Sequence, residues 1–343
     1  NLGATVGWAM IKDRFDWFLN NFYSQRPINS TDPNTPDNIQ DANAFTFGAD
    51  MILPLTARQT FTLRPEYRNF YYETQNTDNQ QYSLAAGWNY ALNRLTYFGL
   101  NGSVRKVDYD ETLIDDVTFS SIFLAISTRR ARSDFTTNLG STRVERDSGQ
   151  STEEFAGNLN WLLGLTARSE FRVFASTDLT DSSTGALNAT VDPGAGDPND
   201  IQITTDVIRS KVFTLGYSRE DGTLRSNLTG QLRELNYSES PNDRRDRSLN
   251  AGFDYPVTGL LVSGLYARYN HTEFINQVRT DNDYTIGGNL RYRLSRKLNS
   301  SFDLKYRNRD SSIETQSFDE WSAYVSLAYG FGQPMRPTRA GGF

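Results

Sequence analysis

Apolar residues alternate with small or polar residues near the C-terminal end of the chain, between Trp321 and Phe331. The first set of alternate positions holds Trp321, Ala323, Val325, Leu327, Tyr329 and Phe331, and the second includes Ser322, Ser326, Ala328 and Gly330. Successive side chains of a strand point to opposite faces, so this segment predicts a strand with one apolar face. Aromatic residues at both ends of an apolar stripe of about ten residues are typical of a strand that crosses a bilayer. A strand of a soluble β-sandwich shows similar alternation, so one strand alone does not decide.

The same pattern recurs along the whole chain, which favours the membrane interpretation. Similar segments lie at Phe15–Tyr23, Phe45–Leu53, Phe61–Tyr67, Tyr82–Leu92, Phe98–Val104, Ile122–Ile126, Phe135–Ser141, Phe155–Leu163, Phe171–Leu179, Phe213–Tyr217, Leu224–Leu232, Leu249–Tyr255, Leu261–Tyr269, Tyr284–Leu294 and Phe302–Tyr306. They predict an all-β fold, a transmembrane antiparallel up-and-down β-barrel of about 16 strands (16–18). Residues 1–331 would form the barrel and residues 332–343 a C-terminal tail. Apolar and polar or small residues also alternate over Asn1–Met10. This segment is a further strand, an extension of the first strand or the end of a missing pair.

Short and long connections alternate along the chain, and this alternation predicts the orientation. The short turns include Pro54–Arg58, Arg129–Ser133 and Ser295–Lys297, and they fall at one end of the predicted barrel. The long connections fall at the other end and are Ser24–Asn43, Asp110–Asp116, Thr180–Thr205, Ser238–Asp246 and Thr272–Asn282. Outer-membrane barrels have short periplasmic turns and longer external loops, so we expect the long connections outside the cell.

The connection Thr180–Thr205 lies in a strongly acidic part of the chain. Six Asp residues and no Lys or Arg occur between Asp178 and Asp206. Asp192, Asp197 and Asp200 match no compact calcium-ligand spacing, so we expect a solvated loop rather than a calcium site. The segment is also long enough to fold into the barrel.

Composition narrows the chemistry. The chain has no Cys and a single His, so we expect no catalytic residue, no metal and no cofactor; His271 has no Ser or Asp partner that the sequence can place beside it. No run of 18 apolar residues forms a transmembrane helix. The mean hydropathy of −0.60 fits a barrel, because polar residues of the lumen offset the lipid-facing residues. No signal peptide is visible at Asn1, so we expect a processed chain or a fragment.

The positions that alternate with the lipid-facing set are expected to line the lumen, and many of them are basic although the formal net charge is −6. The predicted lumen-lining residues are Arg64, Arg68, Arg105, Arg129, Arg172, Arg233, Arg268, Arg291, Arg293, Lys305 and Arg307. Guanidinium groups in a pore favour anions, which predicts an anion preference. Alternatively, these side chains pair with acidic residues of the lumen and only fill a wide barrel. Arg291, Arg293 and Arg307 are expected on adjacent strands, where their fields would add.

The rhythm of Tyr292–Ser312, followed by the strand Trp321–Phe331, resembles the putative β-barrel porin 2 type of Gram-negative outer-membrane protein, a family often associated with exopolysaccharide export. The resemblance implies a location in the Gram-negative outer membrane. It also implies contact with outer-membrane lipids and lipopolysaccharide, and periplasmic export proteins as partners. Such barrels end at the aromatic residue of the last strand, so either Phe331 or Phe343 could act as the assembly signal here. Trp321, Leu327 and Tyr329 would face lipid beside it.

The leading functional hypothesis is therefore an outer-membrane channel that exports a polymer such as an exopolysaccharide, with no enzymatic activity and no nucleic-acid partner. A general or anion-preferring diffusion porin is the first alternative, and it requires a constricting loop that folds inward. A structural barrel that anchors a larger envelope complex is the second.

Overall fold

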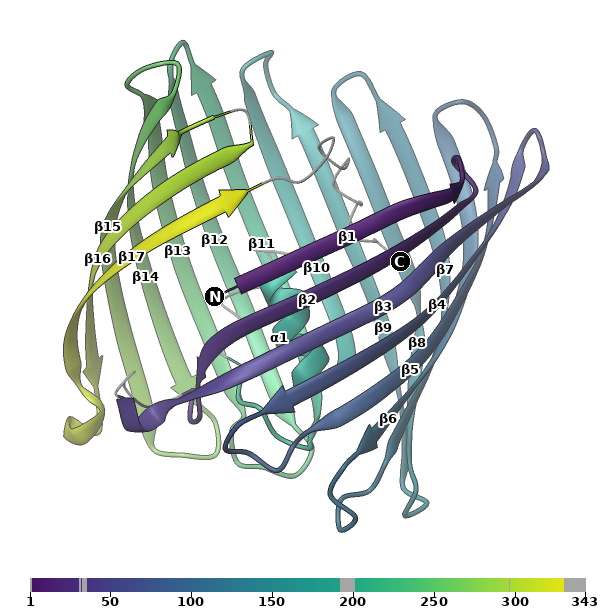
Figure 1. Ribbon diagram of the computed structural model, residues 1–343, viewed down its shortest axis with the longest axis horizontal. Coiled ribbons are helices and arrows are strands. Elements are labelled where there is room, and N and C mark those ends of the chain that lie inside the picture. The colour runs from purple at the N-terminus through teal and green to yellow at the C-terminus, as the bar shows by residue number, and fades with distance from the viewer. Residues whose placement is uncertain (1, 31, 33–35, 192–200, 296, 330–343) are drawn as a thin grey trace.

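The computed structural model describes residues 2–30, 32, 36–191, 201–295 and 297–329, and it is a barrel-shaped meander of antiparallel strands (Figure 1). The 17 strands are β1 (Leu2–Ile11), β2 (Phe15–Pro27), β3 (Ile39–Thr56), β4 (Gln59–Tyr72), β5 (Asn79–Ala91), β6 (Thr96–Tyr109), β7 (Val117–Arg130), β8 (Ser133–Arg146), β9 (Ser151–Gly164), β10 (Ser169–Asp181), β11 (Val207–Asp221), β12 (Leu224–Tyr237), β13 (Arg244–Pro256), β14 (Leu261–Phe274), β15 (Arg279–Arg293), β16 (Leu298–Ser311) and β17 (Phe318–Tyr329). Short 3₁₀ helices lie at Pro36–Asn38 and Glu314–Gln316, and one α-helix, α1, spans Ser182–Val191.

Each strand pairs antiparallel with the next one in sequence, from β1 to β17. The predicted all-β, up-and-down fold is confirmed. The first ten residues form a strand of their own: Trp8 lies opposite Trp17 of β2, and the two rings stack with centroids 6.4 Å apart. The number of strands is therefore odd, so β1 and β17 run in the same direction at the two ends of the meander (Figure 1).

Large apolar side chains cover the outer wall of the barrel. Those at least two-fifths exposed include Leu84, Leu100, Leu124, Phe155, Leu265, Ile286, Leu304 and Leu327. They occupy alternate positions of their strands, as the sequence predicted, while the intervening residues are polar or small. Exposed apolar surface on this scale is unfavourable in water and is stable against lipid acyl chains.

The strands are longer than the apolar alternation indicated. β7 extends on both sides of Ile122–Ile126, and β11 extends on both sides of Phe213–Tyr217. Both faces carry polar residues beyond the apolar band, as at Arg209 and Ser210, so the alternation ends while the backbone ladder continues. For the same reason the connection predicted at Thr272–Asn282 is only residues 275–278 in the structure, and that predicted at Ser24–Asn43 is only residues 28–38.

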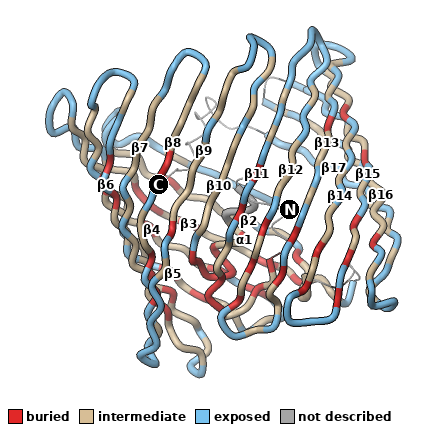
Figure 2. The backbone as a smooth tube through the Cα atoms, turned by 180° about the vertical axis from the view of Figure 1, so that it is seen from behind, coloured by how far each residue is buried: buried red, intermediate tan, exposed pale blue. Residues whose placement is uncertain are grey.

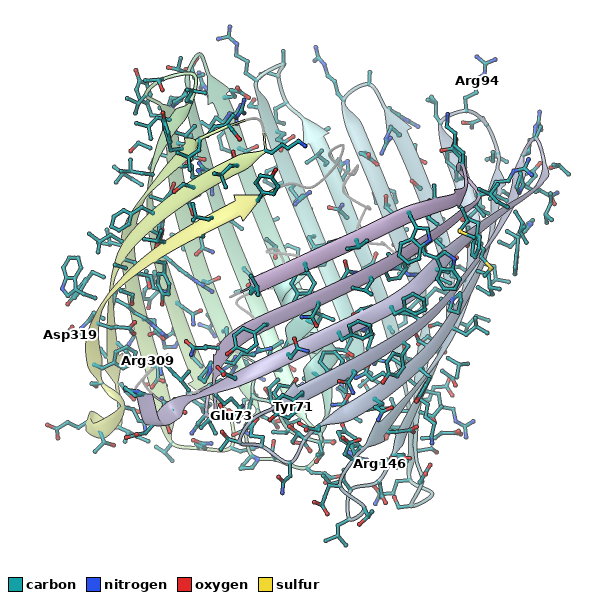
Figure 3. The ribbon with its side chains drawn as sticks, in the orientation of Figure 1. Tyr71, Glu73, Arg94, Arg146, Arg309 and Asp319 are labelled. Atoms are coloured by element: carbon teal, nitrogen blue, oxygen red, sulfur yellow. The ribbon has the colours of Figure 1, made fainter. Side chains whose placement is uncertain are left out.

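The two ends of the barrel differ as the sequence indicated. The short-turn end carries tight connections such as residues 57–58, 131–132 and 222–223, and the long-loop end carries residues 28–38, 110–116 and 182–206. Arg94 marks the short-turn end in Figure 3, and Arg146, Tyr71 and Arg309 mark the long-loop end. Buried residues gather toward the long-loop end, around α1 (Figure 2). The barrel is therefore packed inside at that end.

Candidate functional site: the lumen and its constriction

The connection between β10 and β11 enters the barrel. Its helix α1 lies inside the ring of strands (Figure 1), where Ser182, Ser183, Thr184 and Ala186 are all at most 4% exposed. The prediction of a solvated loop over this segment is thus wrong for residues 182–187, while Asp192, Asp197 and Asp200 lie outside the described residues. Residues 182–187 instead lie inside the barrel, as the length of the connection allowed.

Asp181 begins the helix and fixes it to the wall. Its Oδ1 accepts a hydrogen bond from the backbone N–H of Thr184 at 2.8 Å, which is the N-cap geometry that Asp favours. The same carboxylate accepts from Gln81 Nε2 on β5 at 3.0 Å and pairs with Arg105 Nη1 on β6, also at 3.0 Å. One side chain therefore both starts α1 and joins it to two strands.

Hydroxyl groups of α1 add to this attachment. Thr184 Oγ1 donates to Gln81 Oε1 at 2.9 Å and accepts from Arg105 Nη1 at 2.6 Å. Ser183 Oγ accepts from the Tyr72 hydroxyl at 2.9 Å and from the Asn79 amide at 3.2 Å. These contacts hold the first turn of the helix against the inner face of β4, β5 and β6.

The chain that returns to β11 is held as firmly. Ile201 and Ile203 are at most 9% exposed and belong to a cluster with Ala186 of α1, Tyr72 of β4 and Tyr237 of β12. Gln202 joins this segment to the connection between β2 and β3, which lies at the same end of the barrel. Its Nε2 donates a hydrogen bond to the Ile28 carbonyl at 2.7 Å, and its Oε1 accepts one from the Ser30 N–H at 2.8 Å. The inward segment therefore constricts the lumen near the long-loop end.

A network of buried ion pairs covers the opposite part of the wall. Arg233 pairs with Asp246 at 2.8 Å, and Arg244 approaches the same carboxylate at 3.4 Å. Farther along the wall, Arg279 pairs with Asp281 at 2.6 Å, while Asp283 accepts from both Arg307 and Arg309 at 3.0 Å. Each of these charges has an oppositely charged partner, but these five guanidinium groups face three carboxylates, so the cluster lines the lumen with a positive excess.

The sequence prediction missed most of the acidic members of this network, because Asp246 and Asp281 were placed in loops. Their strands continue to Arg244 and Arg279, so both carboxylates lie on the inner wall. The signal was present as a period of two: Arg244 and Asp246 alternate on β13, as do Arg279, Asp281 and Asp283 on β15.

The predicted lumen residues lie on the inner face of their strands, and the structure gives most of them an acidic partner. Arg64 lies 3.5 Å from both Asp50 and Glu66, and Arg68 pairs with Glu66. The pairs nearer the short-turn end are Arg129 with Asp134 at 2.9 Å and Arg291 with Asp254 at 2.5 Å. Arg268 lies opposite Asn250 and Thr285, and Arg105, Arg233 and Arg307 belong to the contacts described above.

Three predicted lumen cations stand apart from these pairs. Over the described part of the chain, no carboxylate lies within 4 Å of Arg172, Arg293 or Lys305. The Lys305 ammonium instead lies 5.2 Å from the ring centroid of Tyr324. Arg307 and Arg291 do lie on neighbouring strands, but Arg307 is opposite Thr285, about 20 Å along β15 from Arg291 at the strand rise of about 3.3 Å per residue. Their fields therefore act at different depths.

The outward-facing residues of the last strand are exposed. The exposed fraction is 70% for Trp321, 68% for Leu327 and 52% for Tyr329, whereas Phe331 and residues 332–343 lie outside the described residues. His271 also points outward, and its Nδ1 lies 2.9 Å from Asn282 Oδ1. Across the described ranges, no group of three or more His, Cys, Asp or Glu side chains could hold a metal ion, and none of the described helices is long and apolar enough to cross a membrane.

Comparisons with known proteins agree with this architecture. The model of the family described as putative beta-barrel porin 2 matches residues 244–331. The iron transporter FrpB of Neisseria meningitidis is similar in structure, with a TM-score of 0.53 and 11% identity over 89% of this chain and 58% of that one. The siderophore receptor PirA of Pseudomonas aeruginosa has a TM-score of 0.53 and 12% identity over 96% of this chain and 62% of that one.

The chain thus spans less than two thirds of these two proteins, and the likeness to them is one of fold. No curated protein sequence matches the chain. The match of residues 244–331 covers β13 to β17 and confirms the resemblance found in that part of the sequence. The protein is an up-and-down β-barrel of the transmembrane type whose C-terminal part, residues 244–331, matches the family described as putative beta-barrel porin 2.

Proposed function

We propose that the protein is a passive channel for small solutes whose aperture is set by residues 182–187 and 201–206 of the connection between β10 and β11. The observation that carries this proposal is the attachment of α1 inside the barrel through Asp181, Arg105 and Gln81. A constricting segment is what a diffusion porin requires and what an open conduit for a polymer would lack. Hydrogen bonds of residues 182–184 and 202–204 hold these two parts of the connection in the lumen without a partner protein.

A preference for anions is the second part of the proposal. Most lumen arginines contact an acidic partner, so we assign the preference to Arg172, Arg293 and Lys305, which contact none among the described residues. An unpaired cation in a narrow aqueous pore attracts anions and repels cations, whereas an ion pair has little net field.

Polymer export is the second candidate, and the match to putative beta-barrel porin 2 over residues 244–331 favours it through the resemblance to barrels associated with exopolysaccharide export. It requires α1 to leave the lumen. The contacts of Ser183 and Thr184 with the wall are hydrogen bonds, for which water can substitute at small net cost in free energy, so displacement by a partner is physically feasible.

Replacement of the inward segment tests the proposal. Asp181 and Val207 are paired across β10 and β11, so a two-residue turn can join them in place of residues 182–206. In planar bilayers, the shortened protein should show a higher single-channel conductance than the wild type and should admit larger neutral solutes. A matched control shortens the connection 110–116 between β6 and β7, which should leave the conductance unchanged. Equal conductance of the wild type and the variant lacking 182–206 would contradict a constriction at α1. A wild type that does not conduct, beside a variant that does, would favour a displaceable plug.

A further inference from the structure

The outer wall of the barrel carries a groove of about 350 Å³ over β11, β12, β13 and β14. Phe213, Leu215, Leu232, Leu249 and Tyr269 form its outward-facing walls. Its floor is Gly230, which lies in register between Leu215 and Leu249 and where a Cβ atom would meet open space. The groove exists because one strand lacks a side chain where both of its neighbours have a leucine. Its apolar lining fits an acyl chain.

A basic side chain stands at the edge of this groove. Arg247 is exposed, and its neighbours in register on the outer face are Leu232 of β12 and His271 of β14. None of the described carboxylates lies within 4 Å of Arg247. One step nearer the rim, Arg245 and Lys211 share Glu234, at 3.4 Å and 3.2 Å. Arg247 is thus a cation that the protein itself leaves unneutralised on a lipid-facing wall.

The level of Arg247 in the membrane follows from the aromatic residues beside it. Tyr269 and Tyr284 face outward on β14 and β15, two residues nearer the short-turn end than Arg247. Their ring centroids are 5.1 Å apart. Paired outward tyrosines mark the interface between acyl chains and headgroups. A guanidinium at that level lies where lipid phosphates lie, and Arg binds phosphate through a planar fork of donors.

We propose that the groove is a binding site for a phosphorylated glycolipid of the outer leaflet. One acyl chain would occupy the hollow at Gly230, and a headgroup phosphate would accept hydrogen bonds from Arg247. The site lies on the outer wall, so it is independent of what passes through the lumen. It requires the long-loop end to face the outer leaflet.

The test measures binding of lipid A by native mass spectrometry of the purified protein in detergent. Wild-type protein should bind diphosphoryl lipid A more tightly than the fully dephosphorylated form. Arg247→Gln should weaken the binding of the diphosphoryl form by about tenfold or more, the loss expected for a hydrogen bond to a charged group. The same substitution should leave the binding of dephosphorylated lipid A unchanged.

Gly230→Leu tests the hollow separately. The new side chain enters open space, so the barrel should fold normally, as shown by its heat-modifiable mobility on gels, while the affinity for both forms of lipid A falls. Arg143→Gln is the matched control, because Arg143 is exposed on the outer wall of β8 and already pairs with Glu145 at 2.5 Å; binding should not change. Equal binding of both lipids to the wild type, or unaltered binding by folded Arg247→Gln or Gly230→Leu protein, would overturn the proposal.

Discussion

At the scale of single residues, the surroundings of each lumen charge decide what it does. Arg233 is a few per cent exposed and shares Asp246 with Arg244, so its charge is part of the packing of the wall. Lys305 faces the same lumen with an aromatic ring as its neighbour, so its charge is available to a passing ion. Two cations on one inner face thus have different roles, one structural and one in the proposed ion preference.

Removal of the shared carboxylate should destabilise the barrel strongly. Asp246→Asn removes the carboxylate that the buried side chains of Arg233 and Arg244 share, and the loss of one partner of a buried ion pair costs about 3–5 kcal/mol. The measurement is urea unfolding in lipid vesicles, followed by tryptophan fluorescence. Asp221→Asn is the control, because this side chain pairs with Arg219 at an exposed turn, where about 1 kcal/mol or less is expected. A similar loss in both variants would argue against the ion-pair network as a source of stability.

Charge reversal at the unpaired cations should alter ion selectivity. The double variant Arg293→Glu and Lys305→Glu should shift the reversal potential in a KCl gradient towards the cation value, because both side chains face the lumen without an acidic partner in the described structure. Arg94→Glu is the control: Arg94 projects from a short turn, away from the barrel (Figure 3), and its field is screened over about 8 Å at physiological salt. A wild type that prefers cations would refute the proposed role of these residues.

At the scale of the element, the two faces of β17 meet different solvents. Leu327 faces outward and is 68% exposed, whereas Ser326 on the inner face lies 2.6 Å from Ser301 Oγ of β16. The strand is therefore stable only if lipid covers its apolar face. In contrast to the apolar face of β17, α1 packs through polar contacts. Its small hydroxyl side chains allow it to lie against the polar inner wall.

Substitutions on the two faces should have unequal effects. Leu327→Arg places a charge on the lipid face, where the cost is about 2–4 kcal/mol at the bilayer midplane, and should reduce the amount of assembled protein in the outer membrane. Ser326→Arg puts the same side chain into the lumen and should assemble nearly as the wild type does. The fraction of folded protein is read from heat-modifiable mobility. If both variants assemble equally well or equally badly, the facing of β17 is wrong.

At the scale of the whole molecule, the two ends of the barrel differ in connection length and in packing. The long-loop end holds α1 and the buried ion pairs, while the short-turn end has tight hairpins and exposed lumen side chains such as Arg129 and Arg291. The proposed lipid groove extends from the middle of β12 at Gly230 to Arg247, which is nearer the long-loop end. This polarity fits a barrel that is constricted near the cell exterior.

The orientation can be measured with single cysteines, since the chain has none of its own. Leu113→Cys lies in the connection 110–116, where Leu113 is 91% exposed, and should react with a membrane-impermeant maleimide on intact cells. Arg94→Cys at the short-turn end should react only after the outer membrane is permeabilised. The opposite pattern of labelling would reverse the orientation and remove the basis of the outer-leaflet lipid site.

The sequence by itself determined which residues form strands and which side chains face lipid, because alternation with a period of two is a local property of the backbone. It also indicated the two unlike ends and placed basic residues at alternate, inward-facing positions. The strand bounds predicted from the sequence were less accurate at the rims of the barrel. Polar residues occupy both faces there and remove the alternation, although Arg244 and Asp281 still pair within the sheet.

Only the tertiary structure decided that α1 lies in the lumen and which charges form ion pairs. Asp181 meets Gln81 and Arg105 across segments distant in sequence, and Arg233 meets Asp246 through the register of β12 and β13. The groove at Gly230 likewise needs three strands in register. The local sequence pattern does not predict such contacts, because they form only when many hairpins assemble into one sheet. The sequence therefore determines which face of the sheet each side chain occupies, and the folded barrel determines which side chains it contacts.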